Sequence, residues 1–173
     1  QAATVSAAPA ALAAALGAFR GIRQRFEYVG ATARGIPLYN DYAHNVQKIA
    51  AALATAREAA GSPLLALFQP HGYGPFGFMR AALRDTLRET LQPGDRFVLL
   101  PVYYAGGSSS FTPTAAEVAA EYAAAGLPVE AVDTRADAIA AARRAGSAPR
   151  AVLVMGARDP SLPGFAAQLR AAL

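Results

Sequence analysis

Apolar and polar positions follow two alternating patterns along the chain. In some stretches apolar residues recur every three to four positions, as at Ile49, Leu53 and Ala56, which predicts amphipathic helices. Between them lie short, nearly continuous apolar runs, which are typical of strands buried on both faces of a sheet. The predicted helices are Ala8–Ala18, Val46–Ala60, about Gly77–Leu91, Thr114–Ala125, Ala136–Ala145 and one that opens at Pro163. The predicted strands are Arg25–Gly30, Gly35–Asn40, Leu64–Phe68, Arg96–Leu100, Val129–Val132 and Ala151–Met155.

After an opening β-hairpin, strands and helices alternate to the last residue. This order predicts an α/β domain of three layers, in which helices cover both faces of a mostly parallel sheet. We expect residues 19–173 to form this domain. We expect residues 1–18 to be a linker or the tail of a preceding domain.

The composition of the 173-residue chain, 54% hydrophobic and 16% charged, favours a soluble globular domain with a sizeable core. The chain contains no cysteine, which excludes disulfides and thiol chemistry and fits a cytoplasmic location. No apolar run is long enough to span a bilayer, and the arginines behind the net charge of +4 are scattered along the chain. We therefore expect neither a membrane nor a nucleic acid as a partner.

Polar side chains and glycines gather in four loops that follow predicted strands. The loops at the other ends of the strands are chemically bland. Because α/β sheets bind ligands beyond the carboxyl ends of their parallel strands, the four loops predict a binding site. The chain's two histidines, His44 and His71, both lie in them. The loops are Asn40–Asn45, Gln69–Phe76, Tyr103–Ser110 and Gly156–Pro160.

Residues in these loops also have simpler structural interpretations. Asp41 is placed to cap a turn, and Asn45 is placed to cap the following helix. Either histidine could be hydrogen-bonded to the backbone, and Arg158 could form an ion pair with Asp159. The glycine and serine run of the third loop suits an anion-binding turn as well as a surface turn.

Two kinds of site are not predicted, because the sequence lacks their motifs. There is no His-x-x-x-His pair and no cysteine set, so we predict no metal site. The chain has no G-x-x-x-x-G-K-[ST] motif, and Lys48, its only lysine, does not follow a glycine. If the chain handles a nucleotide, residues outside it must hold most of the phosphates.

Five stretches resemble the C-terminal domain of the Mur ligases in order and spacing. They are "FRGIRQRFEYVG", "YNDYAHNVQKIAAALATAR", "LLALFQPHGYGP", "LLPVYYAGG" and "VLVMGARDP". The sequence is most similar to the UDP-N-acetylmuramate–L-alanine ligases and their relatives, over Phe19–Leu173. The resemblance implies a Rossmann-like, mostly parallel six-stranded sheet with one antiparallel strand. It also implies that residues 1–18 are the tail of an ATPase domain.

The resemblance further implies a function. Mur ligases use ATP to activate a carboxylate as an acyl phosphate, which an amine then attacks, in steps that build peptidoglycan precursors. This chemistry needs Mg²⁺ and a site closed to water. The chain would then be the lid domain of a longer, ADP-forming ligase and would be inactive alone. ATP and Mg²⁺ would be held mainly by another domain, and the other partners would be an amino acid and a UDP-sugar or peptide carboxylate.

Individual residues match the family's motifs. Arg25 corresponds to an arginine that reaches the nucleotide, Asp41 to an acidic residue at its ribose, and His71 to a histidine beside the incoming amino acid. The nucleotide-binding residues implied in this way are Arg25, Asp41, Tyr42, His44 and Asn45. Those for the amino substrate are His71 and its neighbours Gly72 and Tyr73. No residue is assigned a catalytic role.

The sequence departs from the alanine ligases at the amine site. There "QPH" continues into an "RYSR"-like run whose arginines hold the amino acid's carboxylate, whereas this chain has Gly72 and Pro75 at those places. We therefore expect an amine that is larger than alanine or is held by another cation. The candidates are Arg158 and Arg80, which is expected in the first turn of its helix. Either arginine could instead be a solvated surface residue.

Two other functions are compatible with the sequence. The chain could be a nucleotide- or ligand-binding module that kept the fold and lost ligation, and a P-loop encoded upstream would argue against this. It could also be a stand-alone hydrolase that uses His71 and Asp41, although no nucleophile elbow follows a predicted strand.

Overall fold

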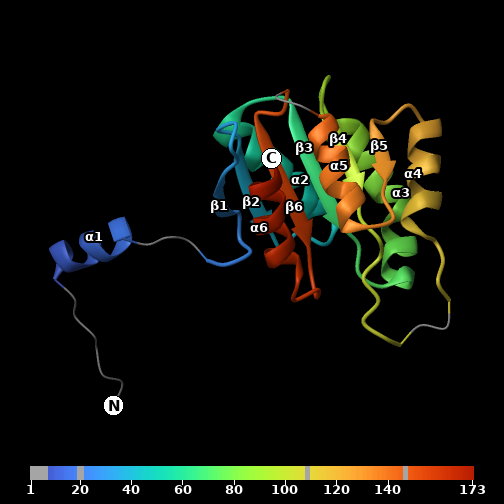
Figure 1. Cartoon of the computed structure of the whole chain (residues 1–173). Coiled ribbons are helices and arrows are strands. Elements are labelled where there is room, and N and C mark those ends of the chain that lie inside the picture. Colours follow the sequence, from blue (N-terminus) through green and yellow to red (C-terminus); the bar gives the residue numbers. More distant parts are fainter. Residues whose placement is uncertain (1–7, 19–21, 108–109, 146–147) are drawn as a thin grey trace, which may run out of the picture.

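The computed structural model describes residues 8–18, 22–107, 110–145 and 148–173. Within these residues one six-stranded sheet contains β1 (Glu27–Ala31), β2 (Pro37–Asp41), β3 (Leu64–Gln69), β4 (Arg96–Leu99), β5 (Val129–Ala131) and β6 (Ala151–Gly156). The strand order is β1-β2-β6-β3-β4-β5; β1 is antiparallel to β2, and the other neighbours are parallel. This sheet, with its opening hairpin, confirms the predicted fold (Figure 1).

Helices cover both faces of the sheet. They are α2 (Val46–Ala60), α3 (Tyr73–Thr90), α4 (Ala115–Ala124), α5 (Arg135–Arg144) and α6 (Leu162–Ala172), and a further helix, α1 (Pro9–Ala18), precedes the sheet in the chain. Because side chains alternate along a strand, Phe68 of β3 points into one apolar core and Leu67 into another. The first core is completed by α2, α3 and α4, and the second by α5 and α6. The sheet is therefore buried on both sides, which explains its continuous apolar runs.

The last strand, β6, lies in the middle of the sheet, between β2 and β3. Asp41 at the end of β2 pairs with Met155, and Gln69 at the end of β3 pairs with Gly156. The loops after these three strands therefore emerge side by side. We call this side of the sheet the carboxyl edge.

The start of α3 differs from the sequence prediction. The chain enters this helix through Gly72, whose φ of 72° suits glycine. Pro75 lies in the first turn, where its missing N–H removes no helical hydrogen bond, and Phe76 is fully buried. Burial of Phe76 outweighs the turn-like composition of this segment. The helix therefore begins at Tyr73, and the predicted start near Gly77 is wrong.

The first helix, α1, differs from the others because none of its residues is buried. Its Leu12 and Leu16 side chains are both exposed, and α1 lies apart from the sheet in Figure 1. It adds to neither core. Among the helices of the described residues, α1 included, none combines the length and the apolar character needed to cross a membrane.

Candidate functional site

The four loops singled out in the sequence converge at the carboxyl edge. Register places the loops after β2, β6 and β3 side by side. The loop after β4 joins them, because His71 forms a β-bridge with Tyr103, whose carbonyl accepts a hydrogen bond from the Gly72 amide at 2.9 Å. The predicted binding loops are thus neighbours in space.

Arg25 lies in a tight turn before β1, not in the strand as predicted, because β1 begins at Glu27. The residues on either side, Gln24 and Phe26, have positive φ angles of 55° and 46°. A left-handed conformation costs a non-glycine residue about 1–2 kcal/mol and needs support from surrounding contacts. The Tyr42 amide supplies one contact, a hydrogen bond of 2.8 Å to the Gln24 carbonyl. The turn leaves the Arg25 side chain exposed.

Asp41 at the end of β2 holds this turn in place. One of its carboxylate oxygens accepts a hydrogen bond from the Phe26 amide and the other from the Ala43 amide, both at 2.7 Å. The turn-capping role of Asp41 is therefore confirmed. Together with Arg25 and Lys48, Asp41 also lines a cavity of about 200 Å³ beside the first turns of α2.

His44 and Asn45 connect this region to α2. Asn45 is the N-cap, and its side-chain oxygen accepts a hydrogen bond from the Lys48 amide at 3.0 Å, which confirms the predicted cap. His44 Nδ1 donates to the Tyr42 carbonyl at 2.8 Å, because a carbonyl can only accept. The His44 ring also lies edge-on to Tyr42 and to His71, with ring centroids 5.4 and 5.6 Å apart.

A larger cavity, of about 540 Å³, opens beside His71. Burial lowers the pKa of His71, and the nearby His44 and Arg158 lower it further. His71 is therefore neutral near pH 7 and can accept a proton or a hydrogen bond. The cavity is lined by His71, Gly72, Tyr73, Gly74, Pro75, Ala105, Gly106, Gly107 and Arg158. The structure thus brings together four of the five residues expected to bind the amino substrate.

Arg158 supplies the positive charge of this cavity from a left-handed conformation, with a φ of 69°. The suggested ion pair with Asp159 is wrong, because Asp159 pairs instead with Arg135 at 2.7 Å. Burial alone would raise the pKa of Asp159, but hydrogen bonds from Ser161, with Arg135 and Gln69, lower it below its usual value. Arg158 is exposed and, among the described residues, forms no ion pair.

Of the residues predicted to bind the amino substrate, Arg80 is the one that does not line this cavity. It occupies the third turn of α3 rather than the first, because the helix starts earlier than predicted. Its guanidinium pairs with Glu121 of α4 at 3.2 Å, and its carbonyl accepts a hydrogen bond from the Tyr122 hydroxyl at 2.6 Å. Arg80 therefore joins α3 to α4 and does not line the cavity.

Two aromatic rings beside the cavity, those of Tyr104 and Phe111, were missed in the sequence, whereas their neighbour Tyr73 was predicted. Tyr73, which lines the cavity, lies 5.5 Å from Phe111 and 6.3 Å from Tyr104 between ring centroids, and Tyr104 lies 5.2 Å from Phe111. We call these rings the aromatic wall. The signal that could have found them is the placement of Tyr104 and Phe111 on either side of the glycine and serine run.

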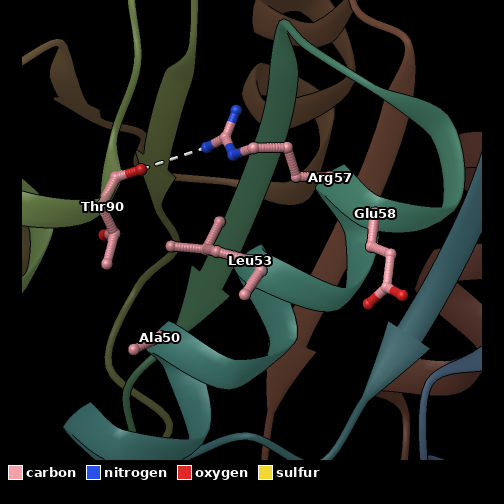
Figure 2. A pocket seen from close by; sticks show the side chains of 6 residues that line it. Ala50, Leu53, Arg57, Glu58 and Thr90 are labelled. Carbon is pink, nitrogen blue, oxygen red and sulfur yellow. Dashed lines mark hydrogen bonds between the residues drawn. The ribbon is translucent and has the colours of Figure 1, made fainter.

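A groove between α2 and α3 also forms a cavity, of about 410 Å³, away from the carboxyl edge (Figure 2). Leu53 and Ala50 make its floor apolar, and Glu58 stands at its border. Its cation, Arg57, forms an ion pair with the Asp95 carboxylate at 2.8 Å and donates a hydrogen bond to the Thr90 carbonyl at 3.1 Å. Because the Arg57 guanidinium is already paired, its role is structural: it joins α2 to the turn before β4.

Two chemistries are not supported by the arrangement of the described residues. They contain no group of three or more His, Cys, Asp or Glu side chains that could hold a metal ion. The hydrolase alternative paired His71 with Asp41. In the structure the His71 ring contacts His44, and both Asp41 carboxylate oxygens accept hydrogen bonds from backbone amides, so the two residues do not form a pair.

Comparison with known proteins agrees with the fold and the motifs. A family model described as Mur ligase, glutamate ligase domain, matches residues 24–158. A UDP-N-acetylmuramate–L-alanine ligase of Acidithiobacillus ferrooxidans is 38% identical over 119 residues, which are 68% of this chain and 25% of that enzyme. The chain thus spans about a quarter of the length of this curated relative.

Solved structures show the same fold. A murein peptide ligase of Psychrobacter arcticus matches 90% of this chain and 31% of its own, with a TM-score of 0.66 and 20% identity. A UDP-N-acetylmuramate–alanine ligase of Thermotoga maritima matches 92% of this chain and 34% of its own, with a TM-score of 0.61 and 21% identity. With a family model that covers most of its residues, the chain belongs to the Mur ligase family and carries that family's glutamate ligase domain.

Proposed function

We propose that this chain acts as the C-terminal lid domain of a longer, ADP-forming ligase of peptidoglycan precursor synthesis. In such an enzyme it would complete the ATP site and bind the amine that is joined to an activated carboxylate. The observation that carries this proposal is the contact between His44 and His71, whose ring centroids are 5.6 Å apart. His44 thereby links the two cavities, because its ring contacts both Tyr42 of the Arg25 cavity and His71 of the Arg158 cavity.

The nucleotide side of the proposal rests on the Arg25 turn and the start of α2. Arg25 projects its guanidinium from a turn that Asp41 and Tyr42 hold, and arginine suits phosphate recognition by charge and by its paired donors. Lys48 lies beside it in the first turn of α2, whose N-terminus carries partial positive charge. These groups favour a polyanion such as ATP.

The amine side rests on the cavity of His71 and Arg158. When an amine attacks an acyl phosphate, its nitrogen bonds to the acyl carbon, the carbon–oxygen bond to the phosphate breaks, and phosphate leaves. An amine is mostly protonated near pH 7, so its nitrogen must lose one proton before it can attack, and it loses a second proton, to water or to the departing phosphate, as the amide forms. His71, kept neutral by burial, His44 and Arg158, is suited to accept the first of these protons.

The remaining partners follow from this proposal. ATP and its Mg²⁺ would be held mainly by residues outside this chain, since the sequence has no P-loop. The carboxylate would come from a UDP-sugar or peptide bound by another domain. We place residues 1–18 at the end of a preceding ATPase domain and residues 19–173 in the lid. The enzyme would work in the cytoplasm, where ATP and nucleotide sugars are made.

A ligation assay on the longer protein that ends in this domain tests the proposal. ADP release should require both a carboxylate substrate and an amine. Arg25→Ala should lower kcat/KM by about 30-fold or more, because a charge-assisted contact in a closed site is worth about 2–4 kcal/mol. Arg34→Ala is the matched control, since Arg34 is also exposed but lies between β1 and β2, at the opposite end of the sheet.

Binding to the present chain gives a second measurement. Calorimetry with Mg-ATP should show a Kd in the high micromolar to millimolar range, as half a site would give, and no hydrolysis. Sub-micromolar binding, turnover by this chain alone, or an Arg25→Ala enzyme as active as the wild type would contradict the proposed role.

A further inference from the structure

The cavity beside His71 has a chemistry that narrows the choice of amine. Among the described residues that line it, Arg158 is a cation, His71 is an uncharged acceptor, and none is an aspartate or glutamate. The other contributions are glycine, alanine and proline surface and the Tyr73 ring. Such a lining can pair with one negative charge and offers no partner for a second positive charge.

Tyr73 of the aromatic wall lines this cavity, and Tyr104 and Phe111 pack against Tyr73 and extend its apolar surface beyond the cavity. Tyr73 lies within 6.3 Å of both other rings, and Phe111 is 54% exposed, so the wall still has ring surface to cover. The wall is also held in place by close packing. A Cβ atom on Gly77 of α3 would lie 2.9 Å from Pro113, so the segment after Phe111 rests directly on the helix.

From these observations, and on the basis of the function proposed above, we propose that the amine is an amino acid with a free α-carboxylate and a bulky, uncharged, apolar side chain. An aromatic side chain would fit best. Arg158 would hold the carboxylate, the amino group would face His71, and the side chain would cover Tyr73 and Phe111. A volume of about 540 Å³ is within the range of small-molecule sites and leaves much empty space around alanine.

Competing amines differ from this one in a single feature each. Alanine keeps the carboxylate but leaves the aromatic wall uncovered. Lysine brings a second ammonium group, which would meet Arg158 and find no carboxylate in the lining. 2-Phenylethylamine keeps the ring and the amino group but has no carboxylate for Arg158. Because burying a large apolar side chain is strongly favourable, phenylalanine should bind about 10-fold or more tightly than alanine.

The two histidines of the chain provide a direct probe of binding. Both lie at the carboxyl edge, so the NMR imidazole spectrum of the purified chain contains two sets of ring signals, one from each histidine, that report on this site. We would titrate the chain with L-phenylalanine, L-alanine, L-lysine and 2-phenylethylamine, each to about 20 mM, which detects millimolar Kd values. L-Phenylalanine should shift the His71 signal at the lowest concentration.

Variants identify the groups responsible. Phe111→Ala should weaken phenylalanine binding about 5-fold or more and leave alanine binding unchanged. Its control is Phe78→Ala, because Phe78 is 94% exposed on α3 and is not part of the aromatic wall. Arg158→Ala should weaken both amino acids, whereas Arg80→Ala should weaken neither, since Arg80 is paired with Glu121 outside the cavity.

The inference is overturned if alanine or lysine shifts His71 at lower concentrations than phenylalanine, or if no amino acid shifts it. It is also overturned if Phe78→Ala and Phe111→Ala have equal effects. The same amines in the ligation assay separate this result from the proposed function. Selective ligation of alanine would support the proposed ligase function and refute the proposed aromatic substrate. Ligation of no amine at all would refute the ligase function. In that case the NMR titration still decides which amino acid the cavity binds.

Discussion

The carboxylate of Asp41 accepts a hydrogen bond of 2.7 Å from the backbone amide of Phe26, a residue 15 positions earlier in the chain. Its second oxygen holds the Ala43 amide at the same distance. Asp41 therefore fixes both the turn that presents Arg25 and the loop that leads to His44. The sequence suggested that Asp41 contacts a ligand. In the structure, Asp41 hydrogen-bonds the turn before β1 to the loop after β2.

Replacement of Asp41 should consequently affect the fold. Asp41→Ala removes two hydrogen bonds to a charged acceptor and frees a strained turn, so the free energy of unfolding should fall by about 2–3 kcal/mol. Urea unfolding measures the effect. Arg25→Ala is the control and should stay within about 0.5 kcal/mol of the wild type, because its side chain is exposed.

His71 should titrate below the ordinary histidine value of about 6.5, because burial, His44 and Arg158 all lower its pKa. Its neutral form is favoured in the folded state, so the stability it contributes is complete above about pH 6.5 and is lost as the pH falls toward its folded pKa. NMR titration of the two sets of imidazole signals measures this directly. His44→Gln should move the pKa of His71 back up, and an unchanged or lower pKa would contradict the coupling.

Asp159 should contribute stability that disappears in acid. Despite burial, its hydrogen bonds with Ser161 and its contacts with Arg135 and Gln69 lower its pKa, so its contribution is present above the unfolded value of about 3.9 and is lost as the pH falls through the folded value. Asp159→Asn should therefore destabilise the chain by about 1–3 kcal/mol near pH 7.

Unfolding at a series of pH values tests this prediction. The difference between Asp159→Asn and the wild type should shrink below about pH 4. Asp133→Asn, which changes an exposed residue, is expected to have little effect near pH 7. A difference between Asp159→Asn and the wild type that persists in strong acid would mean that packing, and not charge, explains the effect.

Asn40 of β2 should be a site where an apolar residue stabilises the chain. It is 1% exposed, and neither its amide nitrogen nor its oxygen has a hydrogen-bond partner in the described part of the structure. Asn40→Leu should raise the free energy of unfolding by about 1 kcal/mol or more, because an unpaired buried amide is unfavourable. Gln69→Leu is the comparison. It also removes a buried amide whose oxygen has no partner among the described residues, but it breaks the hydrogen bond between Gln69 and Asp159 as well, so it should not stabilise. A loss of stability in Asn40→Leu would refute the argument.

The sequence by itself determined which elements form and which loops gather at the carboxyl edge. Burial leaves a local pattern, so apolar runs and helical spacing were enough to predict the strands, the helices and the layers. The Asn45 cap could also be predicted, because its partner Lys48 lies within the same helical turn. The position of the loops after the strands followed from the general geometry of parallel sheets.

Tertiary structure alone decided which residues meet. The central position of β6 brings Arg158 next to His71, and no periodic pattern in the sequence encodes a strand order. Arg135 and not Arg158 became the partner of Asp159, and Glu121 of another helix became the partner of Arg80. The start of α3 at Tyr73 was likewise decided by burial of Phe76 in a core shared with other helices, against the local preference of glycine and proline for turns. Contacts between distant residues depend on packing, and packing exists only once the sheet has formed.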